Sequence, residues 1–133
     1  MSVMYKSVPK TQPGVVGGGQ IKYYASIVRE RPVDIRKIAT EISDMSTLTT
    51  IDVFAVLESF LLRMHAYMEQ GRIVRLGDLG SFSPELTSSG ENAPEEVDRN
   101  TIRKLRVNFR PSMELNDRLS HVKFEKHHDE PTV

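Results

Sequence analysis

Gly71-Arg72-Ile73-Val74-Arg75-Leu76-Gly77-Asp78-Leu79-Gly80-Ser81-Phe82 is the most informative stretch in this chain of 133 residues. It follows a long segment with helical apolar periodicity, so Gly71 is predicted to end a helix. The pattern around the next two glycines predicts a short strand over about 72–77, a tight turn, and a second strand over about 81–86. The stretch therefore indicates a helix followed by a hairpin.

A second stretch, Val107-Asn108-Phe109-Arg110-Pro111-Ser112-Met113-Glu114-Leu115, supplies the expected partner of that hairpin. Its alternation predicts a third strand over about 103–110, which Pro111 ends. Ser112 is predicted to cap a short C-terminal helix. The residues expected to face inward are Leu105, Val107 and Phe109 in the strand, and Leu115, Leu119 and Val122 in the helix.

Two helices are predicted upstream. Asp34 is a suitable N-cap for a helix that runs to about Ser43. Thr49-x-x-Asp52 approximates a capping box for a second helix. The second helix carries a wide apolar stripe, which needs more cover than one short helix provides and so favours a subunit interface. The stripe consists of Val53, Val56, Leu57, Phe60, Leu61, Met64 and Met68.

The first 30 residues contain two different patterns. Residues 1–19 are expected to form a flexible arm, because Pro9 and the Gly17-Gly18-Gly19 run oppose regular structure. The glycine spacing there approaches that of a phosphate loop, but the required Lys and Ser/Thr are missing, so no nucleotide site is expected. Alternation over 20–30 predicts an additional strand.

Two further segments are polar. Residues 87–101 are rich in turn formers and are expected to form an excursion from the sheet, with a short helix near 93–97. Residues 127–133 are expected to form a disordered tail.

The composition is that of a soluble globular protein, with 38% hydrophobic and 27% charged residues, and it predicts one domain with an extra arm. The absence of Cys excludes disulfides and thiolate metal sites. No apolar run is long enough for a membrane span and no secretory signal is visible, so a cytoplasmic location is expected by default. The 18 basic and 18 acidic residues cancel, so only an uneven charge distribution would favour binding to nucleic acid.

The two stretches together resemble the core of the bacterial HU/IHF family of DNA-binding proteins. That family shows G-x-x-V-x-L-x-G-F-G-x-F and, later, V-x-F-x-P-G-x-x-L. Here Asp78-Leu79 stands where Gly-Phe is usual, and Ser112 replaces the Gly of the second pattern. The resemblance covers residues 34–124. With the strand expected over 20–30, the chain is similar to an extended HU-like subfamily, and an HU-like domain is expected over 20–126.

The resemblance implies an α+β fold: two N-terminal helices, a three-stranded antiparallel sheet with a β-arm, and a C-terminal helix, assembled as an intertwined homodimer. In the family a proline at the arm tip wedges between base pairs and kinks the DNA. Pro94 is the possible wedge in the arm at 87–101, but Glu95 and Glu96 flank it, and carboxylates approach phosphates unfavourably. The residues expected in the dimer core are Phe60, Leu61, Met64, Phe82 and Phe109.

The segment from Arg99 to Arg110 has five cations and no acid. Strand alternation places its even-numbered members outward. With the resemblance, this asymmetry predicts a face that contacts the phosphates of double-stranded DNA largely independently of sequence. The open alternative is a solvated sheet face that protects an edge. The candidate DNA contacts are Arg75, Arg99, Arg103, Lys104, Arg106, Asn108 and Arg110.

Two functions therefore stay open: an architectural DNA-binding homodimer, and a structural or protein-interaction dimer with weak or lost DNA binding. Basic Arg99–Arg110 favours the first, and the acidic arm and neutral net charge favour the second. Tyr23 and Tyr24 are further candidates for stacking on bases. No catalytic motif is present, and no cofactor, small-molecule substrate or metal is expected; His65 and the His127-His128-Asp129-Glu130 run are the weak metal candidates.

Overall fold

The computed structural model describes the chain except for residues 1, 13, 15, 18 and 129–133. The chain divides into two compact units. The larger is Val33–Asp117, and the smaller joins Met1–Pro32 to Arg118–Val133. In the smaller unit, strands from the two ends of the chain pair with each other.

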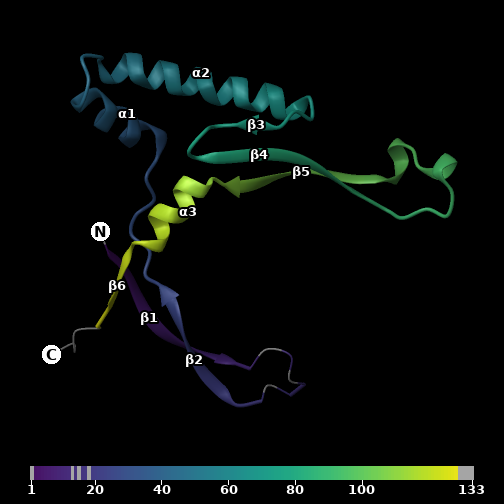
Figure 1. The fold of residues 1–133 in the computed structure, drawn as a ribbon, viewed down its shortest axis with the longest axis horizontal. Helices are drawn as coiled ribbons and strands as arrows, with labels where there is room; N and C mark the ends of the chain where they lie inside the picture. The colour runs from purple at the N-terminus through teal and green to yellow at the C-terminus, as the bar shows by residue number, and fades with distance from the viewer. Residues whose placement is uncertain (1, 13, 15, 18, 129–133) are drawn as a thin grey trace. The chain divides into compact units, whose positions relative to one another are not determined.

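Two helices open the larger unit (Figure 1). In α1 (Ile35–Asp44) the carboxylate of Asp34 accepts a hydrogen bond from the N–H three residues later, at 2.9 Å. In α2 (Thr50–Glu69) the Thr49 hydroxyl does the same at 3.1 Å. Both predicted N-caps are confirmed. After α2 the chain turns at Gly71, whose φ of +75° is one that glycine adopts without strain.

The helices pack on each other, and α2 also contacts the sheet of the larger unit. Among the described residues, no helix is both long enough and apolar enough to span a bilayer.

The sheet of the larger unit is antiparallel with the order β3-β4-β5. It consists of β3 (Val74–Arg75), β4 (Gly80–Ser88) and β5 (Ile102–Pro111). β3 is shorter than the expected 72–77 at both ends. The Arg72 N–H bonds the Tyr67 carbonyl of α2 at 3.1 Å, and the Leu76 N–H bonds the Gly80 carbonyl at 2.9 Å and turns the chain. β4 and β5 continue past β3 as a two-stranded ribbon (Figure 1). The order of helices and strands predicted for the core is confirmed.

The ribbon ends in two single turns of 3-10 helix, η1 (Pro94–Glu96) and η2 (Arg99–Thr101). The first lies where a short helix is predicted. At the base of the excursion, Ser89 N donates to the Thr101 carbonyl at 3.0 Å and closes it.

Close packing requires a glycine at position 80, at the start of β4. Its φ is +146°, outside the range that side chains tolerate. A β-carbon there would meet the Phe109 ring at 2.8 Å and would collide with the Arg110 carbonyl. Only glycine therefore lets β5 approach β4 this closely.

Ser112 joins the two sequence stretches. Its hydroxyl donates to the Asp78 carbonyl, and its N–H donates to the Leu79 carbonyl at 3.2 Å. The same hydroxyl accepts the Leu115 N–H at 3.0 Å and so caps α3 (Met113–Ser120), as predicted. The two departures from the HU/IHF pattern, Asp78-Leu79 and Ser112, thus contact each other.

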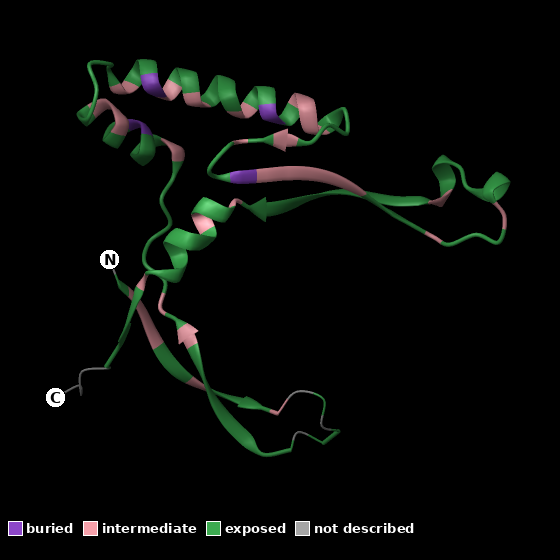
Figure 2. Ribbon diagram, in the orientation of Figure 1, coloured by how far each residue is buried: buried purple, intermediate pink, exposed green. Residues whose placement is uncertain are grey.

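Little of the larger unit is buried within a single chain (Figure 2). The Phe82 and Phe109 rings pack with their centroids 4.8 Å apart. Even so, Phe109 stays 40% exposed and Phe60 on α2 stays 42% exposed. Of the expected dimer-core residues, Leu61 and Phe82 are half-buried and only Met64 is buried. The hydrophobic residues buried within the described chain are Ala39, Val53 and Met64.

The smaller unit is a three-stranded sheet with the order β2-β1-β6. β1 (Ser2–Thr11) pairs antiparallel with β2 (Ile21–Ile27) and parallel with β6 (Lys123–Lys126). Hydrogen bonds from Val28 N to Met4 O at 2.8 Å and from His127 N to Tyr5 O at 2.7 Å extend both pairings.

Several expectations for this unit need correction. The expected irregular arm over 1–19 is wrong for Ser2–Thr11, which form β1. Pro9 is tolerated there because β6 pairs only with Ser2–Tyr5, so Pro9 has a neighbouring strand on one side alone. The strand expected over 20–30 is β2.

The C-terminal end also differs. α3 ends at Ser120, so Val122 lies beyond it, and β6 follows where no strand is predicted. His127 bonds the sheet, whereas residues 129–133 of the expected tail lie outside the described residues.

Candidate nucleic-acid interface

The register of β3, β4 and β5 sorts their side chains onto two faces. Arg75 pairs with Ser81, and Ser81 pairs with Arg110. Residues paired across a sheet project from the same face, so the two arginines flank one serine in a row across three strands. This row is the starting point of the candidate site.

The same face continues along the ribbon. The paired positions toward the tip are Ser83 with Asn108, Glu85 with Arg106, and Thr87 with Lys104. We call this surface the ribbon face. It consists of Arg75, Ser81, Ser83, Glu85, Thr87, Lys104, Arg106, Asn108 and Arg110. Its four cations and one acid give a net charge of +3 per chain.

Glu85 is the one carboxylate on the ribbon face. Its Oε2 lies 3.4 Å from Arg106 Nη2, with the side chains 43% and 62% exposed. An ion pair this exposed contributes about 0–1 kcal/mol, so Arg106 stays available to an incoming anion. Glu85 is absent from the predicted site, although alternation from Ser81 places it on this face.

The structure brings together five of the seven candidate DNA contacts: Arg75, Lys104, Arg106, Asn108 and Arg110. The other two lie apart from the regular ladder. Arg99 belongs to η2. The register passes over Arg103 at an irregularity opposite Thr87 and Ser88. A pairing irregularity of this kind has no signal in the local charge pattern.

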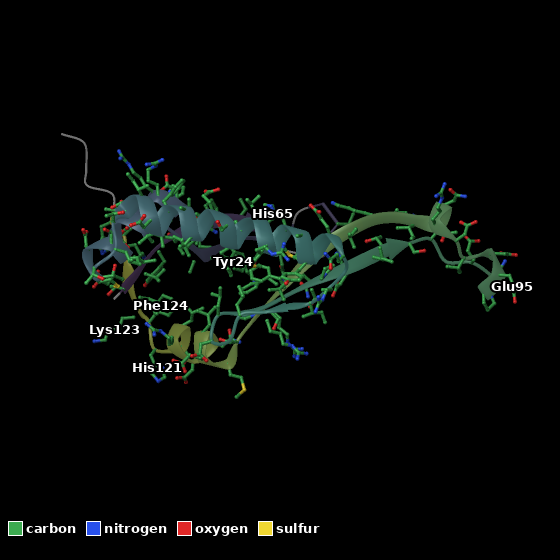
Figure 3. The ribbon with its side chains drawn as sticks, turned by 90° about the horizontal axis from the view of Figure 1, so that it is seen from above. Tyr24, His65, Glu95, His121, Lys123 and Phe124 are labelled. Carbon is green, nitrogen blue, oxygen red and sulfur yellow. The ribbon has the colours of Figure 1, made fainter. Side chains whose placement is uncertain are left out.

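The arm tip has the opposite charge. Between Ser88 and Asn100 there are four acids and one base, a net charge of −3. Glu95 lies at the far end of the ribbon from His65 on α2 (Figure 3). Pro94 opens η1 and is followed directly by Glu95 and Glu96. The Asp98 carboxylate accepts the Asn100 N–H at 2.8 Å, so this acid stabilises η2.

A second cationic cluster lies at the end of α2. The Arg63 and Arg72 guanidiniums lie over the Tyr67 ring, 4.9 and 5.1 Å from its centroid. A hydrogen bond with Arg63 and the charges of both arginines lower the pKa of Tyr67 below its usual value of 10.0. Tyr67, Arg72 and Arg75 line a shallow hollow of about 210 Å³. Arg63 and Tyr67 are four residues apart on α2, a spacing that predicts contact between them, whereas the position of Arg72 depends on the turn after the helix.

The remaining candidates form no such cluster. His65 lines a shallow hollow with Met68 and Val107. The register puts Tyr24 and Tyr23 on opposite faces of the smaller sheet. No group of three or more His, Asp or Glu side chains is arranged to hold a metal ion in the part of the chain that the structure describes. Asp129 and Glu130 of the C-terminal run lie outside that part.

Comparisons with known proteins agree with this architecture. None of the curated proteins compared with the chain matches it. A crystal structure of a protein from Bacteroides vulgatus ATCC 8482, provisionally described as a bacterial DNA-binding protein, matches with a TM-score of 0.69 and 11% sequence identity. The match covers 98% of this chain and 50% of the other, so the chain spans about half the length of that neighbour.

A family model, HU-HIG, described as an HU domain fused to a wHTH, Ig or glycine-rich motif, matches residues 1–126. This range includes both the N-terminal sheet and the ribbon. The chain therefore belongs to the HU-HIG family.

Proposed function

We propose that this protein is an architectural DNA-binding protein of the HU type, a homodimer that contacts duplex DNA through the ribbon face and acts on the bacterial nucleoid. The observation that carries the proposal is the row Arg75–Ser81–Arg110, continued along the ribbon by Arg106 and Lys104. Family membership and the neighbour's description as a DNA-binding protein support the same function.

The proposed mechanism is electrostatic. Cations on a flat strand surface reach phosphates and the groove edge more readily than individual base edges. Binding is therefore expected to be largely sequence-tolerant, with counterion release as its main driving force. The Ser81 hydroxyl lies between Arg75 and Arg110, and Ser83 lies opposite Asn108, so both hydroxyls are placed to donate hydrogen bonds to phosphate oxygens.

The proposed dimer follows from the exposed apolar surface. Leu105, Val107 and Phe109 share one side of β5 and are each 40–50% exposed, as is Phe60 on α2. So much apolar surface on a chain this small is typical of an obligate interface. A second copy would bury this side and double the number of ribbon faces.

The negative charge of the arm tip opposes DNA contact there and supports one alternative function. Insertion of Pro94 between base pairs would bring Glu95 and Glu96 toward the phosphates, which is unfavourable. We therefore assign DNA contact to the ribbon face and not to its tip. An HU-fold dimer that uses an acidic arm to hold a basic protein partner is the second candidate function.

The experiment removes charge from the row that carries the proposal. In Arg75→Gln/Arg110→Gln, two charges are lost where no acid faces them across the strands. The control, Arg31→Gln/Lys37→Gln, removes two exposed charges that lie outside both sheets. Affinity for a random-sequence duplex is measured at several salt concentrations, because each lost phosphate contact lowers the salt slope by about 0.9.

The proposal predicts that the row variant binds about tenfold more weakly at low salt, with a slope lower by about 1.8 for each chain that contacts the duplex. The control keeps the slope of the unaltered protein. Equal salt slopes for both variants would show that the ribbon face does not contact the duplex. Absence of duplex binding by the unaltered protein, with retained dimerisation, would favour the protein-interaction role.

A further inference from the structure

The β2-β1-β6 sheet of the smaller unit has a cationic face of its own. The register puts Lys10 opposite Lys22, and Lys123 opposite Ser2, all projecting on the side of the even-numbered residues of β1. We call this surface the lysine face. It consists of Ser2, Met4, Lys6, Val8, Lys10, Lys22, Tyr24, Ser26, Lys123 and Glu125. Four lysines against one acid give a net charge of +3 per chain.

The opposite face of this sheet is apolar and has a different character. Val3, Tyr5, Ile27 and Phe124 line an open hollow of about 610 Å³ there. The sheet is therefore amphipathic, and its lysines are concentrated on one side. Lys126 is the exception, because its pairing with Tyr5 puts it on the apolar face.

The pair Lys10 and Lys22 is unfavourable for the isolated sheet. Like charges directly opposite each other on neighbouring strands destabilise a sheet. Neither ammonium group has an ion pair with an acid in the part of the chain that the structure describes. A bound anion would relieve this repulsion.

The arrangement fits an extended polyanion better than a small one. The lysines come from all three strands, and Lys6 and Lys10 lie about 13 Å apart along β1 at the usual rise per residue. A single phosphate cannot bridge that distance, whereas a phosphodiester backbone presents charges at regular intervals. Tyr24, 37% exposed and opposite Val8, adds an aromatic ring among the lysines, as nucleic-acid-binding sheets do.

We propose that the lysine face is a second phosphate-contacting surface for duplex DNA, in addition to the ribbon face. This inference rests on the proposed DNA-binding function. It gives the N-terminal strands a role in DNA binding that does not depend on the acidic arm tip.

The test uses the full chain with Lys10→Gln/Lys22→Gln. Its control, Lys37→Gln/Lys126→Gln, removes the same charge, with one of its two positions on the opposite face of the same sheet. Duplex affinity is measured against salt concentration for both, beside Arg75→Gln/Arg110→Gln. Removing two phosphate contacts is expected to lower the salt slope by about 1.8 per contacting chain and to weaken binding about tenfold at low salt. Circular dichroism checks that each variant is folded.

The outcomes separate the two proposals. A lower slope for the lysine variant than for its control supports the second surface. An unchanged slope, in a protein whose binding still depends on Arg75 and Arg110, overturns the second surface alone. No duplex binding by the unaltered protein overturns both. If the lysine variant loses binding to anionic phospholipid vesicles but keeps its duplex affinity, the face binds membranes and the inference is wrong.

Discussion

The two sheets of this molecule have similar faces but differ in how far their apolar sides are covered. Each has one cationic face and one apolar side. In the larger unit α2 contacts the sheet, and glycine and aromatic packing lock β4 to β5. In the smaller unit Ile21, Tyr23 and Phe124 on the apolar face remain 65–71% exposed. The larger sheet is thus stabilised in part by side-chain packing, whereas the smaller sheet is held mainly by the pairing of its backbones.

The two cationic faces also differ in the type and pairing of their charged residues. On the ribbon face the cations are mostly arginines, and one acid already pairs with Arg106. On the lysine face two lysines face each other across β1 and β2. Arginine suits fixed, hydrogen-bonded contacts, whereas lysine acts as a mobile point charge. We expect the ribbon face to orient the duplex and the lysine face to add unspecific attraction.

The strongest effect is expected where the larger sheet and its helix are proposed to form a subunit interface. Phe60→Glu places a charge on the exposed side of α2, which the proposed dimer buries. A buried unpaired charge costs several kcal/mol, so the variant is expected to dissociate and to lose most of its helical signal. Sedimentation equilibrium measures the mass, which should fall from twice the chain mass of 15.1 kDa toward that mass.

Tyr23→Glu on the smaller sheet is the matched comparison, and we expect it to keep the dimer. A single-chain mass for the unaltered protein, or a Phe60→Glu variant that stays fully dimeric, would contradict the assignment of this side of α2 to the interface.

An intermediate effect tests whether close packing of β4 on β5 distinguishes the larger sheet. Gly80→Ala introduces a β-carbon against Phe109 and Arg110 at a positive φ. Such strain costs about 1–3 kcal/mol before the collision is relieved, so Tm should fall by roughly 10 °C or more in a melting experiment. Gly90→Ala meets nothing within 4 Å and should melt like the parent. Equal melting of both variants would show that β5 does not depend on this approach.

The weakest effect concerns the electrostatic difference between the two faces. Glu85→Gln removes the one acid of the ribbon face and frees Arg106. Because exposed ion pairs contribute about 0–1 kcal/mol, stability should change little, while duplex affinity should rise about twofold, equivalent to roughly 0.4 kcal/mol. Glu58→Gln, an exposed charge on α2, serves as the control in a fluorescence anisotropy titration. Weaker duplex binding by Glu85→Gln would mean that the carboxylate positions Arg106 for contact.

Much of the larger unit is predictable from local chemistry. Asp34, Thr49 and Ser112 cap helices because short polar side chains satisfy free N–H groups. Simple alternation along β5 separates Arg106 and Arg110 from Val107 and Phe109. These features depend on neighbours a few residues away, which the amino-acid sequence shows directly.

The smaller unit is not predictable in the same way. Its strands β1 and β6 come from opposite ends of the chain, and a pairing over such a separation leaves no local pattern. Glycines and prolines near β1 are typical of an irregular arm, yet they are compatible with a strand in which Pro9 has a paired neighbour on one side alone. Only the pairing of the strands reveals that Lys10 faces Lys22.

The helix caps, the turn at Gly80 and the alternation of charge along β5 were contained in the order of the amino acids alone, because each follows from short-range geometry. Three features came only from folding in three dimensions: which residues lie opposite each other on neighbouring strands, where Arg103 leaves the ladder, and the joining of both chain ends in one sheet. They depend on the register between strands distant in sequence, which is fixed only when the backbones pair.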